Sequence, residues 1–248
     1  MSKFELERER LVADQIEARG VRDALVLASM RSVRRELFVP ANVASMAYRD
    51  GPLPIGGGQT ISQPYIVAYM VEALALKGGE RILEVGAGSG YAAAVLAEIA
   101  RDVYTIERIA QLAERAATNL RRAGCKNVHV RHADGTEGWI DEAPFDAILV
   151  SAGAPDIPKS LMRQLSVGGR MVIPVGSDLR AQELIRVTRI DGDEFEREDI
   201  ADVRFVPLIG KEGWETEESD WETRPPRVVQ RRPAVSISLP GLIAKHGD

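Results

Sequence analysis

The chain of 248 residues contains only one cysteine, Cys125, so it cannot form an intramolecular disulfide and is compatible with a reducing compartment. Its three histidines lack the spacing of metal ligands, and we expect no metal site. No apolar run approaches the roughly 20 residues of a membrane span. Charged residues fill the N-terminus, where a signal peptide would need an apolar segment. We therefore expect a cytoplasmic protein without a membrane anchor.

Basic residues are fewer than acidic ones, with 32 Lys and Arg against 37 Asp and Glu. The formal net charge of −5 at pH 7 argues against a nucleic-acid-binding groove, and we expect neither nucleic acid nor a membrane among the partners. With 45% hydrophobic and 28% charged residues, the composition is that of an ordinary globular protein. The length suits one large domain with appendages, which we expect to be a monomer.

Residues 81–96, RILEVGAGSGYAAAVL, organise the rest of the chain. A short apolar run is followed by three glycines at alternate positions, Gly86, Gly88 and Gly90, and then by an alanine-rich segment of high helix propensity. This order predicts a strand, a tight turn and a helix. Glycines at such a turn allow positive φ and a close approach of a ligand, and the free amides that open the helix can bind electronegative atoms. We therefore predict a nucleotide-like ligand at this turn.

The residues around the turn favour one kind of nucleotide. A dinucleotide fingerprint needs a further glycine where this chain has Tyr91, which disfavours NAD. Glu84 stands before the turn, and Glu107 ends the next apolar run, where its carboxylate can accept two hydrogen bonds from a ribose diol. An acidic site without a lysine or arginine in the loop suits a cationic adenosine that has no phosphate, which is S-adenosylmethionine (SAM). The alternative is that the glycines only let the strand pack closely on the helix.

The first 50 residues are predicted to form a helical cap, because apolar residues recur at helical spacing in residues 4–19 and 21–30. The next segment, residues 51–58 (GPLPIGGG), is so rich in glycine and proline that we expect a loop without regular structure. It leads into GQTISQP at the entrance of a helix predicted for residues 65–76, where Thr60 or Ser62 could cap the helix. Helix capping and a functional role of this loop are both open at this point.

Strands and helices alternate through the middle of the chain. Helices are predicted at residues 109–123 and 158–165, and strands at residues 103–107, 128–131, 146–150 and 170–175. This alternation indicates an α/β fold with a doubly wound, Rossmann-like parallel sheet. Ligands of such sheets bind beyond the carboxyl ends of the strands. Predicted strands end at or just before Gly86, Glu107, Asp134 and Ser151, so we expect these residues around one crevice.

The C-terminal part has a different pattern. Residues 184–190 and 203–207 are predicted to be antiparallel strands that complete one edge of the sheet. Residues 212–222 are strongly acidic and residues 224–232 are basic, which is typical of an appendage and not of a core. Within this tail, residues 234–239 alternate enough to form one short strand.

Six ordered blocks carry a resemblance to a known family. They are PLPIGGGQTISQPYIVAYM, LEVGAGSGY, HADGTEGW, FDAILVSAGAPDIP, GGRMVIPVG and VRFVPL. Through them the chain is similar to the protein-L-isoaspartate (D-aspartate) O-methyltransferases over roughly residues 11–213. The resemblance implies a SAM-dependent repair enzyme that methylates the free carboxylate of L-isoaspartyl residues in damaged proteins and peptides, with D-aspartyl residues as a second substrate to be tested. It also implies a methyltransferase domain in residues 1–213, with the cap in residues 1–50, and a C-terminal extension in residues 214–248.

The same resemblance implies which residues form the site. The serine of the TIS tripeptide, Ser62, corresponds to the catalytic residue of the family. The implied SAM contacts come from the TIS segment, the glycine loop and the ends of two further strands, and they are Gln59, Thr60, Ile61, Ser62, Glu84, Gly86, Gly88, Gly90, Glu107, Arg108, Asp134 and Gly135. The resemblance implies no metal.

Two features depart from the family pattern. Ile209 follows VPL where family members often have threonine, and the tail after Trp214 exceeds the usual family length. The tail leaves a second hypothesis open, in which the enzyme methylates an aspartate of one dedicated partner peptide that docks on the tail. A third hypothesis is a SAM-binding protein without catalysis, but the presence of both Ser62 and Glu107 argues against it.

Overall fold

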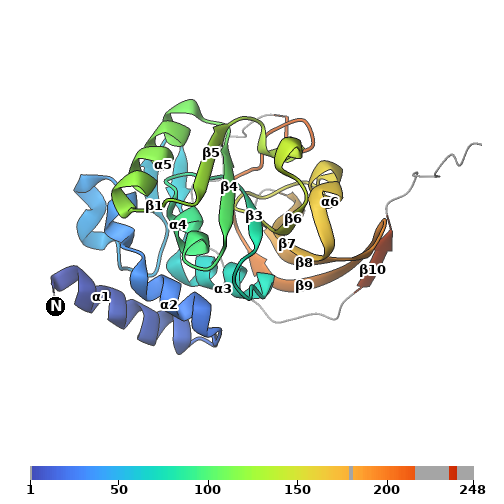
Figure 1. The fold of residues 1–248 in the computed structure, drawn as a ribbon. Helices are drawn as coiled ribbons and strands as arrows, with labels where there is room; N and C mark the ends of the chain where they lie inside the picture. The colour runs from blue at the N-terminus through green and yellow to red at the C-terminus, as the bar shows by residue number, and fades with distance from the viewer. Residues whose placement is uncertain (1, 179–180, 216–234, 239–248) are drawn as a thin grey trace, which may run out of the picture.

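A mixed β-sheet forms the centre of the molecule (Figure 1). The computed structural model describes residues 2–178, 181–215 and 235–238. The sheet has eight strands in the order β10-β9-β8-β7-β6-β3-β4-β5. Its parallel half consists of β3 (Arg81–Val85), β4 (Asp102–Glu107), β5 (Val128–His132), β6 (Phe145–Val150) and β7 (Leu165–Asp178). The predicted doubly wound, Rossmann-like sheet is therefore confirmed.

Helices cover both faces of the parallel half. Neighbouring residues of a strand point to opposite faces of the sheet, and both faces carry apolar side chains that the helices bury. On β3, Ile82 belongs to the apolar cluster on one face and Leu83 to the cluster on the other. α6 (Lys159–Gln164) packs on the Leu83 face, and the Ile82 face carries α3 (Pro64–Leu74), α4 (Tyr91–Ala97) and α5 (Ala110–Ala123). Among the described residues, no helix has both the length and the apolar character needed to cross a membrane.

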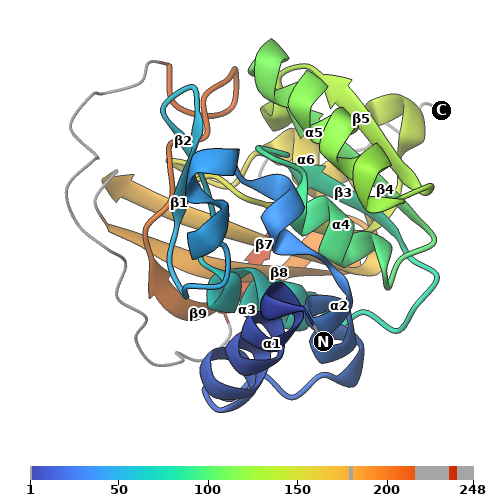
Figure 2. The same cartoon turned by 90° about the vertical axis from the view of Figure 1, so that its left-hand side faces the viewer.

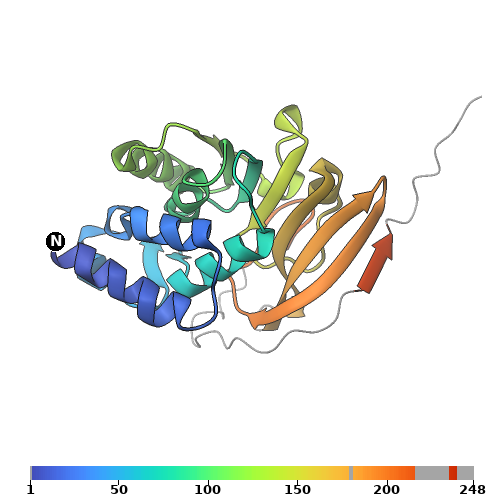
Figure 3. The ribbon, with the colours of Figure 1, turned by 60° about the horizontal axis from the view of Figure 1, so that its bottom comes forward.

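The N-terminal residues form the expected helical cap. Its elements are α1 (Lys3–Arg10), a π-helix that continues it (Leu11–Glu17), α2 (Ala24–Ser32) and two 3₁₀ turns (Arg35–Phe38 and Ala41–Met46). Val12, Ile16 and Met30 are buried in the same apolar cluster as residues of α3 and α4. The cap, blue in Figure 3, is therefore part of the core and packs beside α3.

The segment predicted to be an irregular loop is a β-hairpin, which stands apart from the main sheet (Figure 2). Its antiparallel strands are β1 (Leu53–Gly56) and β2 (Gln59–Ile61). The prediction was wrong because the alternation of buried Leu53 and Ile55 with exposed Pro54 outweighs the glycine and proline content. Proline is tolerated in a two-stranded sheet, where every strand is an edge, and Gly57 and Gly58 turn the chain with positive φ.

The antiparallel edge of the sheet is confirmed, but one of its strands lies elsewhere than predicted. The strands are β8 (Ala181–Asp191), β9 (Glu194–Val203) and β10 (Val235–Ser238). β9 begins at Glu194, just after the turn at Gly192, whereas the strand was predicted at residues 203–207. Its charged sequence, EFEREDIADV, hides the strand because only Phe195, Ile200, Ala201 and Val203 are buried. Residues 216–234 and 239–248 of the predicted extension lie outside the described residues.

Candidate active site

A cleft opens beyond the carboxyl ends of β3, β4 and β6. The space of the cleft, counted together with its open mouth, is about 780 Å³. Its lining consists of Val67, Gly135 and residues 59–62, 84–89, 91–92, 106–109, 151–152 and 206–209. Gly86, Glu107 and Ser151 line this cleft together, as predicted from their positions at strand ends.

The glycine loop between β3 and α4 is held by β4. The amides of Gly86 and Ala87 both donate to the carbonyl of Ile106, at 2.8 and 3.1 Å. Gly86 and Gly88 have φ values of 92° and 54°, which suit glycine, and both line the cleft. Gly90 does not line it, and a Cβ there would lie 3.1 Å from Leu120 Cγ of α5. Gly90 therefore allows close packing, as the alternative interpretation expected, whereas Gly86 and Gly88 line the cleft.

Glu107, the last residue of β4, is held by two backbone amides. Its Oε2 accepts from the amide of Gly88 at 2.8 Å and its Oε1 from the amide of Ile109 at 2.9 Å. The side chain is buried, with the residue 6% exposed, and lines the cleft. Each carboxylate oxygen keeps a further lone pair, so the group can still accept hydrogen bonds from a diol. Arg108 also lines the cleft, and its carbonyl hydrogen-bonds His132 Nε2.

Glu84 also lines the cleft and is fully buried. Thr105 Oγ1 donates to its Oε2, while its Oε1 has no hydrogen-bond partner among the described residues, and neither has Ser89 Oγ. Burial raises the pKa of Glu84 to about 8; the charge of Glu107 adds to the rise, and hydrogen bonding to Thr105 and to the backbone of Ala93 opposes it. Buried polar atoms rarely stay unpaired, and both residues line the cleft, so these two oxygens can take hydrogen bonds from a polar ligand group.

Another side of the cleft is lined by the second hairpin strand and the residue after it, which are Gln59, Thr60, Ile61 and Ser62. The capping interpretation is wrong, because α3 begins at Pro64 and its N-cap residue, Gln63, makes no side-chain cap. Proline in the first helical position places the cap at Gln63, one residue beyond Ser62. Among the described residues, the Ser62 hydroxyl has no hydrogen-bond partner, so it is available to a ligand.

Asp134 and Gly135, a predicted pair, have different surroundings. Gly135 lines the cleft, and a Cβ there would lie 2.5 Å from Val85 Cγ1, so only glycine fits. The carboxylate of Asp134 accepts from the Thr136 amide and hydroxyl, both at 2.8 Å, and from the Lys211 amide, also at 2.8 Å. Asp134 is not part of the lining, and its contact with a cofactor stays a prediction.

Residues 206–209 form a wall of the cleft, although the predicted set of site residues includes none of them. Val206 and Leu208 join this wall to Gly153, whose amide donates to Val206 O and whose carbonyl accepts from Leu208 N, both at 2.8 Å. Trp214 closes the following loop through a 3.0 Å bond from its indole Nε1 to Gly153 O. The VRFVPL block could have indicated these residues, but it was interpreted as a strand at the edge of the sheet and not as part of the site. Ile209, the departure from the family pattern, makes this wall apolar at its end.

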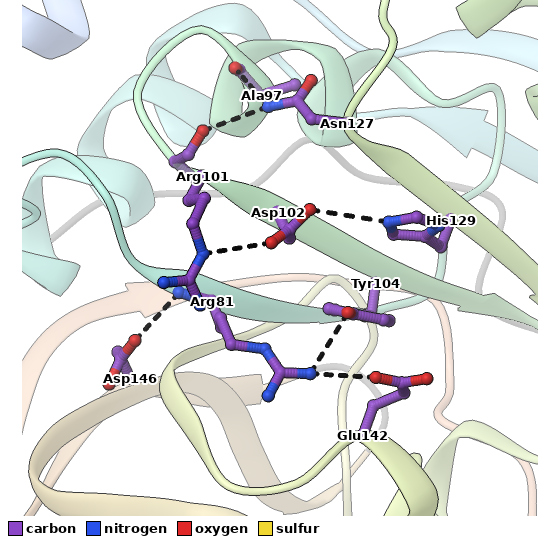
Figure 4. Close-up of polar contacts among 10 residues, drawn as sticks. Arg81, Ala97, Arg101, Asp102, Tyr104, Asn127, His129, Glu142 and Asp146 are labelled. Atoms are coloured by element: carbon purple, nitrogen blue, oxygen red, sulfur yellow. Dashed lines mark hydrogen bonds and ion pairs between the residues drawn. The ribbon is translucent and has the colours of Figure 1, made fainter.

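The opposite ends of the same strands carry a polar network with a structural role (Figure 4). Arg81, which opens β3, donates to the Tyr104 hydroxyl at 3.1 Å and to Glu142 Oε2 at 2.9 Å, and its amide donates to Asp146. His129 lies 3.6 Å from Asp102, the first residue of β4. Across the described ranges, no group of three or more His, Cys, Asp or Glu side chains could hold a metal ion.

Comparison with known proteins points to one family. Residues 6–213 match the family model described as protein-L-isoaspartate(D-aspartate) O-methyltransferase (PCMT). The chain is 62% identical over 213 residues to protein-L-isoaspartate O-methyltransferase 1 of Rhodopseudomonas palustris (strain HaA2), covering 86% of this chain and 87% of the relative. It is 53% identical over 215 residues to the protein-L-isoaspartate O-methyltransferase of Geobacter metallireducens, covering 87% and 99%.

Two solved structures have a similar fold. A protein-L-isoaspartate O-methyltransferase superposes with a TM-score of 0.76 at 30% identity, covering 83% of this chain and 67% of that one. A β-aspartate methyltransferase (PCMT) from Plasmodium falciparum, in complex with S-adenosyl-L-homocysteine, superposes with a TM-score of 0.71 at 27% identity, covering 84% and 99%.

Proposed function

The chain belongs to the protein-L-isoaspartate(D-aspartate) O-methyltransferase family, and we propose that its cleft transfers the methyl group of SAM to the free carboxylate of L-isoaspartyl residues in damaged proteins and peptides. The observation that carries this proposal is the juxtaposition of Ser62 and Glu107 on the lining of one cleft. The two residues come from separate blocks of the family pattern, and each has the surroundings that its role requires.

The residues of the cleft fit SAM. The amide-held carboxylate of Glu107 suits a ribose diol. The unpaired oxygens of Glu84 and Ser89 suit the polar amino-acid end of the cofactor. Gly86 and Gly88 let the ligand approach the backbone closely. The roles of Gln59, Thr60, Ile61, Arg108 and Gly135 as further SAM contacts are part of this proposal, and all of them line the cleft.

The proposed methyl transfer requires little proton transfer by the protein. An isoaspartyl carboxylate with an ordinary pKa near 4 is already ionised at neutral pH, so no general base is needed. SAM supplies a methyl group on a positively charged sulfonium, and opposite charges cancel as the carboxylate attacks. An apolar wall such as Pro207, Leu208 and Ile209 favours this step, because lost hydration costs the charged ground state more than the less charged transition state.

Within this scheme, Ser62 orients the substrate carboxylate. A neutral hydroxyl can hold an attacking oxygen while leaving it nucleophilic, whereas a strong cationic clamp would quench it. Positioning of this kind can supply most of the remaining rate enhancement. The enzyme performs only the methylation. The methyl ester then cyclises when the following backbone nitrogen attacks its carbonyl and methanol leaves, and the succinimide reopens partly as normal aspartate.

We further propose that the protein is a monomeric, cytoplasmic enzyme that does not bind nucleic acid. The single cysteine and the net charge of −5 support this assignment. The match to the family ends at residue 213, which supports a division into a methyltransferase domain and a C-terminal extension. The same observation keeps the dedicated-partner hypothesis as the second candidate.

A methyl-transfer assay tests the proposed function. The wild-type protein receives labelled SAM and one of three peptides that differ only at one position, which is L-isoaspartyl, D-aspartyl or normal L-aspartyl. We expect transfer to the isoaspartyl peptide and none to its normal twin, while the D-aspartyl peptide defines the substrate range. Transfer to none of them, together with transfer to one cellular peptide containing normal aspartate, would establish the dedicated-partner hypothesis instead.

A further inference from the structure

Ser62 takes its position from its neighbours in the chain. Its hydroxyl has no partner among the described residues, and it stands between β2, which ends at buried Ile61, and α3, which begins at Pro64. Since neither Gln63 nor Pro64 supplies a side-chain cap, the start of α3 must be fixed from elsewhere. Whatever fixes it also decides where Ser62 points.

Asp50 supplies the missing contacts from outside the helix. Its Oδ1 accepts from the amide of Tyr65 at 3.1 Å, which is the first amide that α3 presents after Pro64. Its Oδ2 accepts from Gln63 Nε2 at 2.7 Å and from Arg19 Nη1 at 2.7 Å. Both oxygens of Asp50 are thus used to hold the residue directly after Ser62 and the first turn of the helix.

Arg19 and Arg35 make this anchor rigid. The guanidinium of Arg19 lies 3.5 Å from the centre of the Tyr65 ring while it pairs with Asp50, whose side chain is 10% exposed. Arg35 is fully buried and donates to the carbonyls of Ala47 at 2.8 Å and Gly51 at 3.5 Å, on either side of Asp50. The chain that carries the carboxylate is therefore fixed by the core of the helical cap.

We propose that Asp50 is a positioning residue for Ser62, acting through Gln63 and the first turn of α3. This inference rests on the proposed function of the cleft. Asp50 is not part of the cleft lining, so it holds the hydroxyl in place without touching the ligand. Because displacement of a positioning group by about 1 Å can cost on the order of 100-fold in rate, loss of this anchor reaches turnover through geometry alone.

The test compares two aspartates that cap helices. Asp23 caps α2, its Oδ1 accepting from the amides of Leu25 at 2.9 Å and Val26 at 3.0 Å, and it is not part of the cleft lining. We expect Asp50→Ala to lower kcat on the isoaspartyl peptide about tenfold or more, while SAM affinity measured by calorimetry changes less than about threefold. Asp23→Ala, which also loses a helix cap, should keep wild-type kcat per folded molecule. Equal kcat values for the two variants would overturn the proposal.

A conservative variant and an independent readout sharpen the test. Asp50→Asn keeps one acceptor oxygen for the Tyr65 amide but loses the charge paired with Arg19, so its kcat should lie between wild type and Asp50→Ala. Hydrogen exchange of the Tyr65 amide reports the anchor without any catalysis. A wild-type protein inactive on isoaspartyl peptides would refute the proposed function, whereas unchanged Tyr65 exchange in Asp50→Ala would refute the anchor. Faster exchange in Asp50→Ala but not in Asp23→Ala supports it.

Discussion

On the glycine-loop side of the cleft, the backbone amides of Gly88 and Ile109 hold the Glu107 carboxylate. On the Ser62 side, the hydroxyl has no partner among the described residues, and its backbone is anchored by Asp50, which Arg19 holds in turn. The first arrangement involves only residues at or just after the carboxyl ends of two neighbouring strands, β3 and β4. The second joins the hairpin, α3 and the N-terminal cap.

The contrast separates two tasks. A carboxylate fixed by main-chain amides is suited to binding a cofactor in one orientation before any reaction takes place. A hydroxyl fixed only through its neighbours contributes mainly when the reacting groups are aligned, so it affects the transition state more than the ground state. We therefore expect variants on the glycine-loop side to change SAM affinity and variants on the Ser62 side to change turnover.

Of the variants considered, Glu107→Ala should have the largest effect, and it should change only the glycine-loop side of the cleft. It removes the proposed diol contact and leaves the amides of Gly88 and Ile109 without their acceptor. Hydrogen bonds to a charged acceptor are worth roughly 1.5 to 3 kcal/mol each, so SAM affinity should fall about 100-fold or more. Calorimetry on the folded variant measures this, with Glu114→Ala on the exposed face of α5 as the control. Unchanged affinity would remove Glu107 from the site.

Ser62→Ala should affect turnover and leave the other side intact. We expect single-turnover rates on an isoaspartyl peptide to fall about 30-fold, or ~2 kcal/mol, with little change in SAM affinity. Because Ser62 caps no helix, stability should stay at the wild-type value. Ser2 provides the matched serine, since its hydroxyl does cap α1 by accepting from the Glu5 amide. Ser2→Ala should lose about 0.5 to 1 kcal/mol of stability and keep full turnover; the reverse pattern would reject the assignment of Ser62.

Glu84→Gln tests how the glycine-loop side depends on pH. The pKa of Glu84 is raised from 4.5 to about 8 by burial, so between these values the folded protein keeps a proton that the unfolded chain has lost. Its contribution to stability is complete below pH 4.5 and disappears as the pH rises toward 8. Near pH 6 to 7 the loss should be about 1.4 kcal/mol per pH unit.

Chemical denaturation of the ligand-free protein at several pH values measures this slope. The glutamine variant keeps the shape and a hydrogen-bonding group but does not titrate, so its stability should vary less with pH by about the amount given above. A variant whose pH slope equals that of the wild type would show that Glu84 is not the group responsible.

Truncation of the tail should have the smallest effect on both sides of the cleft. Removal of the residues after Glu215 takes away β10, which pairs with β9 at the outer edge of the sheet, and we expect SAM affinity to stay within about twofold of wild type. Removal after Gly213 also takes Trp214, which bonds to Leu208 and Gly153. The shorter chain should therefore lose stability and part of its activity. Equal behaviour of the two truncations would show that Trp214 does not support the wall.

The parallel sheet and its glycine turn could be predicted because their signals are local. The run before Gly86 and the alanines after Gly90 fix a strand and a helix within a short stretch of chain. Gly124 ends α5 as predicted, because its φ of 85° suits glycine. The ends of parallel strands lie along one edge, so Glu107 and Ser151 could also be brought to one cleft from their places in the sequence.

The remaining features depend on contacts between distant segments. Nothing near Asp134 in the sequence shows that its carboxylate accepts a hydrogen bond from the amide of Lys211. The acidic run of β9 forms a strand through pairing with β8 and β10 on its two sides. The role of Asp50 depends on Arg19, which lies 31 residues earlier in the chain. Such contacts are determined by tertiary packing, and they cannot be predicted from the periodicity of hydrophobic residues in the sequence.

The wall at residues 206–209 also has a consequence for the order in which the protein matures. A ribosome releases the hairpin, the glycine loop and Glu107 well before it releases Val206 and Leu208, which join the cleft through Gly153. Until then, a nascent chain can build the parallel sheet but has a cofactor site that is open on one side. Competence to hold SAM is thus acquired late in synthesis, when the chain returns to the site from the far edge of the sheet.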